Sequence, residues 1–144
     1  IVAAVQDRNV IVDAVAGAGK TTTIVGVVDA VPRSIVLTYN SRLRVETEQR
    51  IGRDRIVFTF HGLATRLAGD VVWNDGLLKQ ALDSGVSLAC PALTERCELL
   101  VIDEIQDMTP LLYRLVRAFL DTFSVPSSAT TRRPRTVRVP IRGR

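Results

Sequence analysis

A glycine-rich loop that ends in lysine and threonine constrains this chain more than any other feature. The sequence A-V-A-G-A-G-K-T occupies residues 14–21, between an apolar run at 10–15 and a helical pattern at 20–30. It matches the phosphate-binding pattern G-x-x-x-x-G-K-[ST], except that Ala14 replaces the first glycine. Gly17 and Gly19 let backbone N–H groups turn toward an anion, and the following helix presents its positive end. A chance match in a surface loop is the alternative, but strand, glycines, lysine and helix all occur in register.

The loop predicts which residues would contact a nucleotide. Lys20 is expected to reach the β- and γ-phosphates, and the Thr21 hydroxyl is expected to hold Mg²⁺. ATP and Mg²⁺ are therefore the expected cofactors. The expected nucleotide-binding residues are Ala16, Gly17, Ala18, Gly19, Lys20, Thr21 and Thr22.

A second motif follows the apolar run at 99–102, where the sequence D-E-I-Q-D occupies residues 103–107. An acid at the end of a buried strand commonly holds Mg²⁺ in phosphate-loop enzymes, and Asp103 fits that role together with Thr21. Glu104 could act as a general base toward water, and Gln106 could sense the γ-phosphate. Acidic residues also begin many helices, so this motif alone is weak evidence for a nucleotide site. It becomes informative because a phosphate-binding loop lies upstream.

Apolar runs alternate with helical patterns along the chain. Runs expected to be strands lie at residues 10–15, 34–38, 56–59 and 99–102, and expected helices lie at 20–30, 40–51, 61–67, 75–84 and 109–123. Runs that are apolar throughout are typical of parallel strands buried on both faces. We therefore expect an α/β fold with a parallel sheet sandwiched by helices.

Together these motifs resemble superfamily 1 DNA helicases of the UvrD/Rep-like group. That group has an alanine where most such loops begin with glycine, and its acidic motif is D-E-x-Q-D. Thr38-Tyr39-Asn40 is similar to its T-[FY]-[TN] motif, and Thr59-Phe60-His61 to its T-x-H motif. The resemblance covers residues 1–123. It implies a RecA-like P-loop NTPase domain that couples ATP hydrolysis to translocation on DNA and unwinding, with Lys20, Asp103, Glu104 and Gln106 as the catalytic residues.

The resemblance also implies single-stranded DNA as a partner. Tyr39 could stack on a base, while Asn40, Thr59 and His61 could hold phosphates or sugars. Structural roles are the alternative: Tyr39 could cover the sheet, and His61 could be a residue at a helix start.

The resemblance further implies a second motor domain, and arginines that complete the ATP site. Because the sequence begins at Ile1 and shows neither, we expect a fragment that is inactive alone. One alternative is a non-catalytic nucleotide-binding remnant. Another is a P-loop ATPase with no unwinding role. ATP turnover stimulated by single-stranded DNA would separate a motor from both.

Residues 124–144 differ from the rest of the chain. The net charge is +4, but six arginines and no acid follow Asp121; without those six, 13 basic residues face 15 acidic ones. With no apolar periodicity, residues 124–144 are expected to be a disordered basic tail. A second hypothesis is a frame shift, since codons for residues 132–141 exist that give G-D-P-A-Q-S-V-Y-Q-F one base later. The resembled family carries a G-D-x-x-Q motif there.

Membrane and metal-centre classes are disfavoured. No apolar run approaches the ~18 residues that a membrane span needs, so no membrane partner is expected. Cys90, Cys97 and His61 form no metal-binding pattern, and we expect reduced thiols in an intracellular protein.

Overall fold

The computed structural model describes residues 3, 9–12, 14–15, 19–52, 54–85, 88, 90–124, 135–139 and 141–142. The elements follow in the order β1 (Val10–Ile11), β2 (Ala14–Val15), α2 (Lys20–Ala30), β3 (Ser34–Thr38), α3 (Ser41–Ile51), β4 (Ile56–Thr59), α4 (Phe60–Ala68), α5 (Asp75–Asp83), α6 (Pro91–Thr94), β5 (Leu99–Asp103), η1 (Ile105–Asp107), α7 (Pro110–Asp121), η2 (Thr122–Ser124), β6 (Arg135–Val139) and β7 (Ile141–Arg142).

Five strands form one sheet in the order β1-β6-β5-β3-β4, and every neighbouring pair is parallel. The register sets Val36 of β3 opposite Val101 of β5, which in turn lies opposite Val137 of β6. A separate two-stranded parallel sheet joins β2 to β7. The expected α/β fold with a parallel sheet between helices is confirmed.

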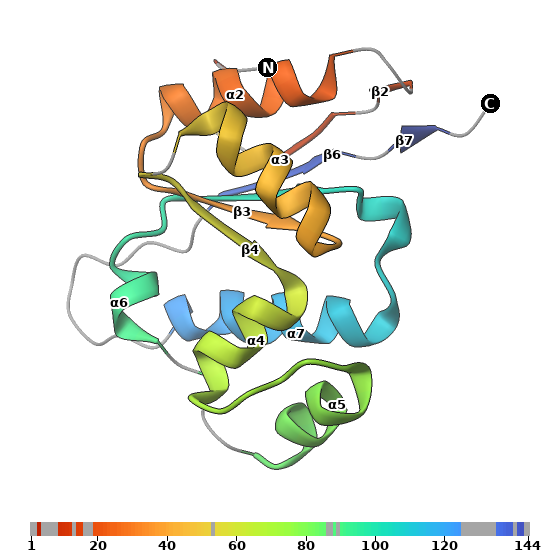
Figure 1. Cartoon of the computed structure of the whole chain (residues 1–144). Coiled ribbons are helices and arrows are strands. Elements are labelled where there is room, and N and C mark those ends of the chain that lie inside the picture. Colours follow the sequence, from red (N-terminus) through yellow and green to blue (C-terminus); the bar gives the residue numbers. More distant parts are fainter. Residues whose placement is uncertain are drawn as a thin grey trace.

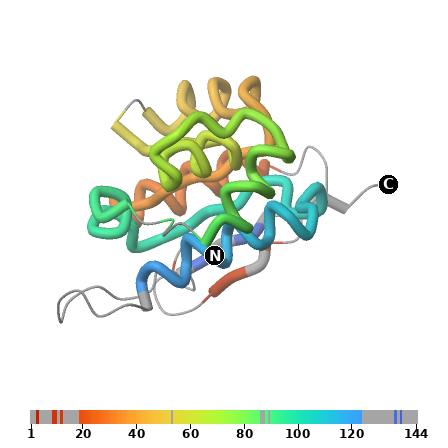
Figure 2. The backbone as a smooth tube through the Cα atoms, turned by 90° about the horizontal axis from the view of Figure 1, so that it is seen from below, coloured from red at the N-terminus to blue at the C-terminus, as the bar shows by residue number. Residues whose placement is uncertain are grey.

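Alternate residues of the central strands face two separate cores. Ile35 and Leu37 pack with α4, α5 and α7, whereas Val36 and Val101 pack with α2 and α3. Figure 1 shows α2 and α3 above the sheet and α4 and α7 below it. Seen from below in Figure 2, α7 and the α4–α5 pair lie side by side. Burial on both faces explains why these strands are apolar throughout.

Four helices begin at a polar residue whose side chain accepts a backbone N–H. These caps are Asn40, Thr59, Asn74 and Thr109. Helix α5 begins at Asp75, as expected, but the expectation that Asp75 itself caps the helix was wrong, because the Asn74 amide oxygen, 2.9 Å from Leu77 N, forms the cap. Pro110 occupies the first turn of α7, as expected.

Two expectations were wrong. The run at 10–15 does not form one strand, since β1 and β2 belong to different sheets. The segment after residue 123 is not without regular structure, because 135–139 form β6 between β1 and β5. Thr136 is buried there, and its backbone N–H donates to Asn9 Oδ1 at 2.9 Å. Backbone pairing with two neighbours compensates for the weak apolar pattern.

No helix among the described residues is both long enough and apolar enough to cross a membrane.

Candidate functional site

Helix α2 begins after a glycine rather than after a capping side chain. Gly19 precedes it in the left-handed conformation, with φ 77°, and provides no side-chain cap; the first turn holds no acid. The helical bonding starts at Thr23 N–H, which donates to Gly19 O at 3.0 Å. Helical geometry thus gives the N–H groups of residues 20–22 no acceptor within the helix. Together with the helix dipole, they form a place for an anion.

The carboxyl end of β5 brings two acids to this helix start. Asp103 is buried, and one of its oxygens accepts the Glu104 backbone N–H at 3.0 Å. Burial raises the pKa of the Asp103 carboxyl above its usual range. The Lys20 ammonium opposes that rise, whereas the Glu104 charge adds to it. A nearby cation therefore matters more for keeping this buried carboxylate ionised than it would for an exposed carboxylate.

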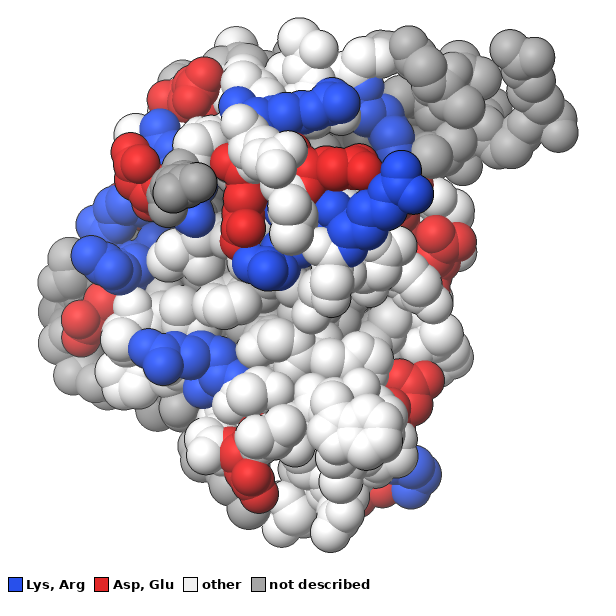
Figure 3. All heavy atoms as spheres, viewed as in Figure 1, with Lys and Arg blue, Asp and Glu red and all other residues white. Residues whose placement is uncertain are grey.

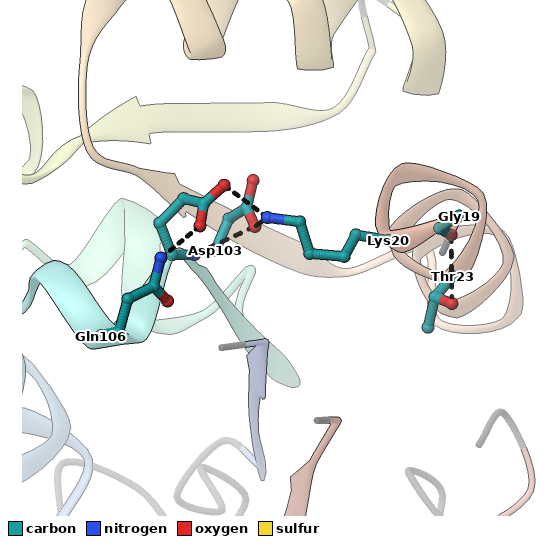
Figure 4. Close-up of polar contacts among 6 residues, drawn as sticks. Gly19, Lys20, Thr23, Asp103 and Gln106 are labelled. Atoms are coloured by element: carbon teal, nitrogen blue, oxygen red, sulfur yellow. Dashed lines mark hydrogen bonds and ion pairs between the residues drawn. The ribbon is translucent and has the colours of Figure 1, made fainter. Parts of the chain in front are cut away.

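Lys20 supplies that cation. Its ammonium donates to Glu104 Oε1 and lies 3.5 Å from Asp103 Oδ1. The three side chains are only 10–13% exposed. Figure 4 shows Lys20 reaching from the start of α2 to the carboxylates beyond β5, with Gln106 on their other side. Gln106 Nε2 donates to Glu104 Oε2 at 2.6 Å. One cation, two acids and one amide form a connected group.

The Glu104 backbone is in an uncommon conformation. With φ 56° and ψ 46°, Glu104 is the one non-glycine residue of the described part of the chain at positive φ. The left-handed region costs an L-residue about 1–2 kcal/mol. Residues held in this way concentrate at functional sites. Glu104 directly precedes η1, and the turn of η1 brings Gln106 back toward Glu104.

The donor set fits a nucleotide with Mg²⁺. Amides with no acceptor within their own helix and one lysine suit phosphate, while Asp103 offers oxygen to a hard cation. Within the described ranges, no cluster of three or more His, Cys, Asp or Glu side chains could enclose a metal. Mg²⁺ typically takes one or two carboxylates and completes its shell with substrate phosphates and water, so the site is suited to Mg²⁺ carried with nucleotide.

Most of the predicted nucleotide-site residues come together. Lys20 contacts Asp103 and Glu104, and Gln106 contacts Glu104. Thr21 and Thr22 lie in the first turn of α2, where Thr22 is exposed. The predicted residues Ala16, Gly17 and Ala18 lie outside the described residues. The sequence pattern assigned Lys20 to phosphate and did not indicate that Lys20 pairs with Glu104.

The predicted DNA-contacting residues follow β3 and β4. The oxygens of Asn40 and Thr59 cap α3 and α4, accepting from Leu43 N at 2.9 Å and Gly62 N at 3.0 Å. His61 Nε2 lies 3.0 Å from Asp75 Oδ1, so it links α4 to α5. Tyr39 is 43% exposed. Thr38, whose role the sequence did not indicate, is buried with its hydroxyl near Asn40 O and Phe58 O.

Charged side chains on the face drawn in Figure 3 gather over α2 and α3, whereas the part below is largely uncharged. Both signs occur there. On α3, Arg42 pairs with Glu46 at 2.9 Å and Arg44 pairs with Glu48. This face is therefore not a uniformly basic surface.

Comparison with known proteins agrees with this geometry. A search of curated proteins finds no match to the chain. The family model described as the AAA domain matches residues 1–125. That domain supports a nucleotide-dependent activity, usually with Mg²⁺. Since the match spans most of the 144 residues, the chain belongs to the AAA domain family.

Proposed function

We propose that the chain binds ATP with Mg²⁺ between the start of α2 and the carboxyl end of β5. We further propose that it is the N-terminal motor domain of a UvrD/Rep-like DNA helicase. One observation carries the nucleotide site: Lys20, at a helix start without a side-chain cap, lies against Asp103 and Glu104. The helicase assignment rests on the D-E-x-Q-D, T-[FY]-[TN] and T-x-H motifs and agrees with the family match.

Each residue of the site has a role in this proposal. Lys20 and the N–H groups of the first turn of α2 bind the phosphates. Thr21 and Asp103 hold Mg²⁺, which when bound neutralises phosphate charge. Glu104 accepts a proton from the attacking water as a general base. Gln106, already bonded to Glu104, orients that carboxylate.

The sheet topology supports a connection between this site and DNA. Strands β3, β4 and β5 are parallel neighbours, so their carboxyl ends lie at one edge. Tyr39, Asn40 and His61 follow two of these strands, and Asp103 ends the third. Tyr39 is exposed enough to stack on a base. Because Asn40 and Thr59 already use their oxygens as caps, contacts to phosphate would come from the Asn40 amide N–H groups and the Thr59 hydroxyl.

A P-loop ATPase without an unwinding role is the second candidate. The mixed charge around α3 favours it, because nonspecific nucleic-acid binding generally needs an excess of basic side chains. His61 also favours it, since the Asp75 carboxylate beside it would repel a phosphate. The two candidates share the nucleotide site and differ only in their response to DNA.

Calorimetry on two lysine variants tests the nucleotide site. Lys20→Ala should lose most of its affinity for Mg-ATP, because it removes the cation from the phosphate position. Lys79→Ala is the matched control. The Lys79 side chain is 67% exposed on α5 and its ammonium pairs with Asp83 at 2.6 Å, so the affinity for Mg-ATP should not change. Equal affinity for wild type and Lys20→Ala would refute the site.

A steady-state ATPase assay with and without single-stranded DNA separates the candidates. Stimulation by DNA of a protein that contains this domain and its partner motor domain supports the helicase. The isolated chain should bind ATP and turn it over slowly, because family members draw stabilising arginines from a second domain. No described arginine forms an ion pair with Asp103 or Glu104.

A further inference from the structure

We infer that Glu104 and Gln106 form a latch that keeps Lys20 off the phosphate position until nucleotide displaces it. The inference rests on the proposed nucleotide site and adds a form of regulation to it. Gln106 is a positioning residue in this latch, because it acts on Lys20 through the Glu104 carboxylate.

Three contacts define the latch. Lys20 donates to Glu104 Oε1. The other carboxylate oxygen, Oε2, accepts from Gln106 Nε2 at 2.6 Å, so both oxygens are engaged at once. Asp103 Oδ1 lies 3.5 Å from the same ammonium and holds it from a second direction. With Lys20 and Glu104 side chains each 13% exposed, water competes weakly for these groups.

The charges make this arrangement incompatible with bound phosphate. Two carboxylates around one ammonium leave the cluster with a net negative charge, which repels a phosphate. For Lys20 to serve the nucleotide, its bond to Glu104 must break. A cation arriving on Asp103 would compensate the carboxylates and release Lys20, so nucleotide and Mg²⁺ should bind with positive coupling.

The Glu104 backbone conformation makes the latch dependent on the contacts around it. Glu104 is held at φ 56°, and Gln106 is brought back to it by the single turn of η1. This conformation is disfavoured for glutamate and has to be held by surrounding contacts. The Gln106 bond is one such contact, so removing it should free Glu104 to leave Lys20.

Calorimetry with ADP in EDTA and in Mg²⁺ tests the latch without a γ-phosphate or turnover. In EDTA, Glu104→Gln should bind ADP about tenfold more tightly than wild type, since a bond to a charged partner no longer competes. Gln106→Ala should bind about threefold more tightly, as expected for losing one hydrogen bond. In Mg²⁺ both gains should shrink, because the cation already releases Lys20.

Two control variants isolate the cause. Glu98→Gln makes the same charge change at the opposite end of β5, where Glu98 pairs with Arg33 and is about half exposed, and should leave affinity unchanged. Gln80→Ala, on the exposed surface of α5, matches Gln106→Ala. Gln106→Ala removes no charge, so its effect cannot come from reduced repulsion of phosphate. Thermal melts establish that each variant is folded.

The outcomes separate the latch from the nucleotide site. If Glu104→Gln tightens ADP binding and Gln106→Ala does not, simple repulsion explains the gain and the latch is overturned. If neither variant changes affinity while Lys20→Ala abolishes it, the site stands and the latch fails. If Lys20→Ala binds ADP like wild type, the proposed site itself fails. Should Glu104→Gln not fold, Gln106→Ala alone decides between gain and no gain.

Discussion

Gly19 and Gly69 offer a matched test of whether the start of α2 binds phosphate through its backbone. Both have left-handed backbones, with φ +77° and +71°, and both flank a helix. A Cβ on Gly19 would meet its nearest neighbour, Thr22 Oγ1, at 3.8 Å, and one on Gly69 would meet nothing within 4 Å. Neither alanine clashes, so the cost is conformational, about 1 kcal/mol in each case. For a domain of this size, that lowers the Tm by roughly 2–4 °C.

The two variants should differ in binding. Relieving the strain in Gly19→Ala means turning the backbone N–H groups of the first turn away from the phosphates. Losing one bond to a charged group costs about 1.5–3 kcal/mol, which is a ten- to hundredfold loss of affinity. Gly69→Ala, at the far end of α4, should bind as wild type does. Urea denaturation and calorimetry with Mg-ADP measure both quantities. Unchanged affinity in Gly19→Ala, or equal losses in both variants, would refute the assignment of these amides to phosphate.

Three further outcomes follow from burial and pairing. Asp103→Asn should be more stable than wild type at pH 7 in EDTA. The pKa of Asp103 is raised in the folded protein, so folding opposes its ionisation and wild-type stability falls as pH rises through that pKa. Thermal melts of the two proteins should therefore give the same Tm at low pH. Burial raises the pKa of Cys97 to about 12, so at pH 8 a thiol reagent should modify Cys90 in the folded protein and Cys97 only after unfolding. Deleting residues 125–144 should lower the Tm by about 10 °C or more through loss of the backbone bonds of β6; an unchanged Tm would show that β6 does not pair in the sheet.

The sequence predicted best those elements that a short run of apolar residues identifies by itself. Strands β3 and β4 have the predicted bounds, and β5 extends the predicted run by Asp103. Strands β3 and β5 lie inside the sheet and β4 lies at its edge beside β3, and their apolar content was enough to identify all three. Helix ends were less accurate because a cap depends on one side chain: Asn74, rather than Asp75, turned its oxygen to the helix.

The sequence motifs indicated candidate site residues but did not indicate how their side chains contact one another. Glycine, lysine and paired acids at strand ends are needed by the chemistry, so the sequence indicates them directly. The contact between Lys20 and Glu104 depends on the backbone conformation of Glu104 and on the turn of η1. The Glu104 backbone and the turn of η1 depend in turn on the packing at the end of β5, which a sequence pattern does not reveal. The same holds for Asn40 and Thr59, whose motif positions turned out to carry helix caps.

Strand β6 shows most clearly why sequence composition can mislead. An internal parallel strand should be nearly all apolar, yet β6 contains Arg135 and Arg138 beside Val137 and Val139. Its place is set by topology: β1 and β5 both need a parallel neighbour, and backbone pairing is indifferent to side chains. Regular pairing of this segment with β1 and β5 counts against the frame-shift hypothesis. That hypothesis stays a prediction, and the nucleotide sequence decides it: a one-base shift must restore G-D-x-x-Q at 132–136, or the arginines are native to β6.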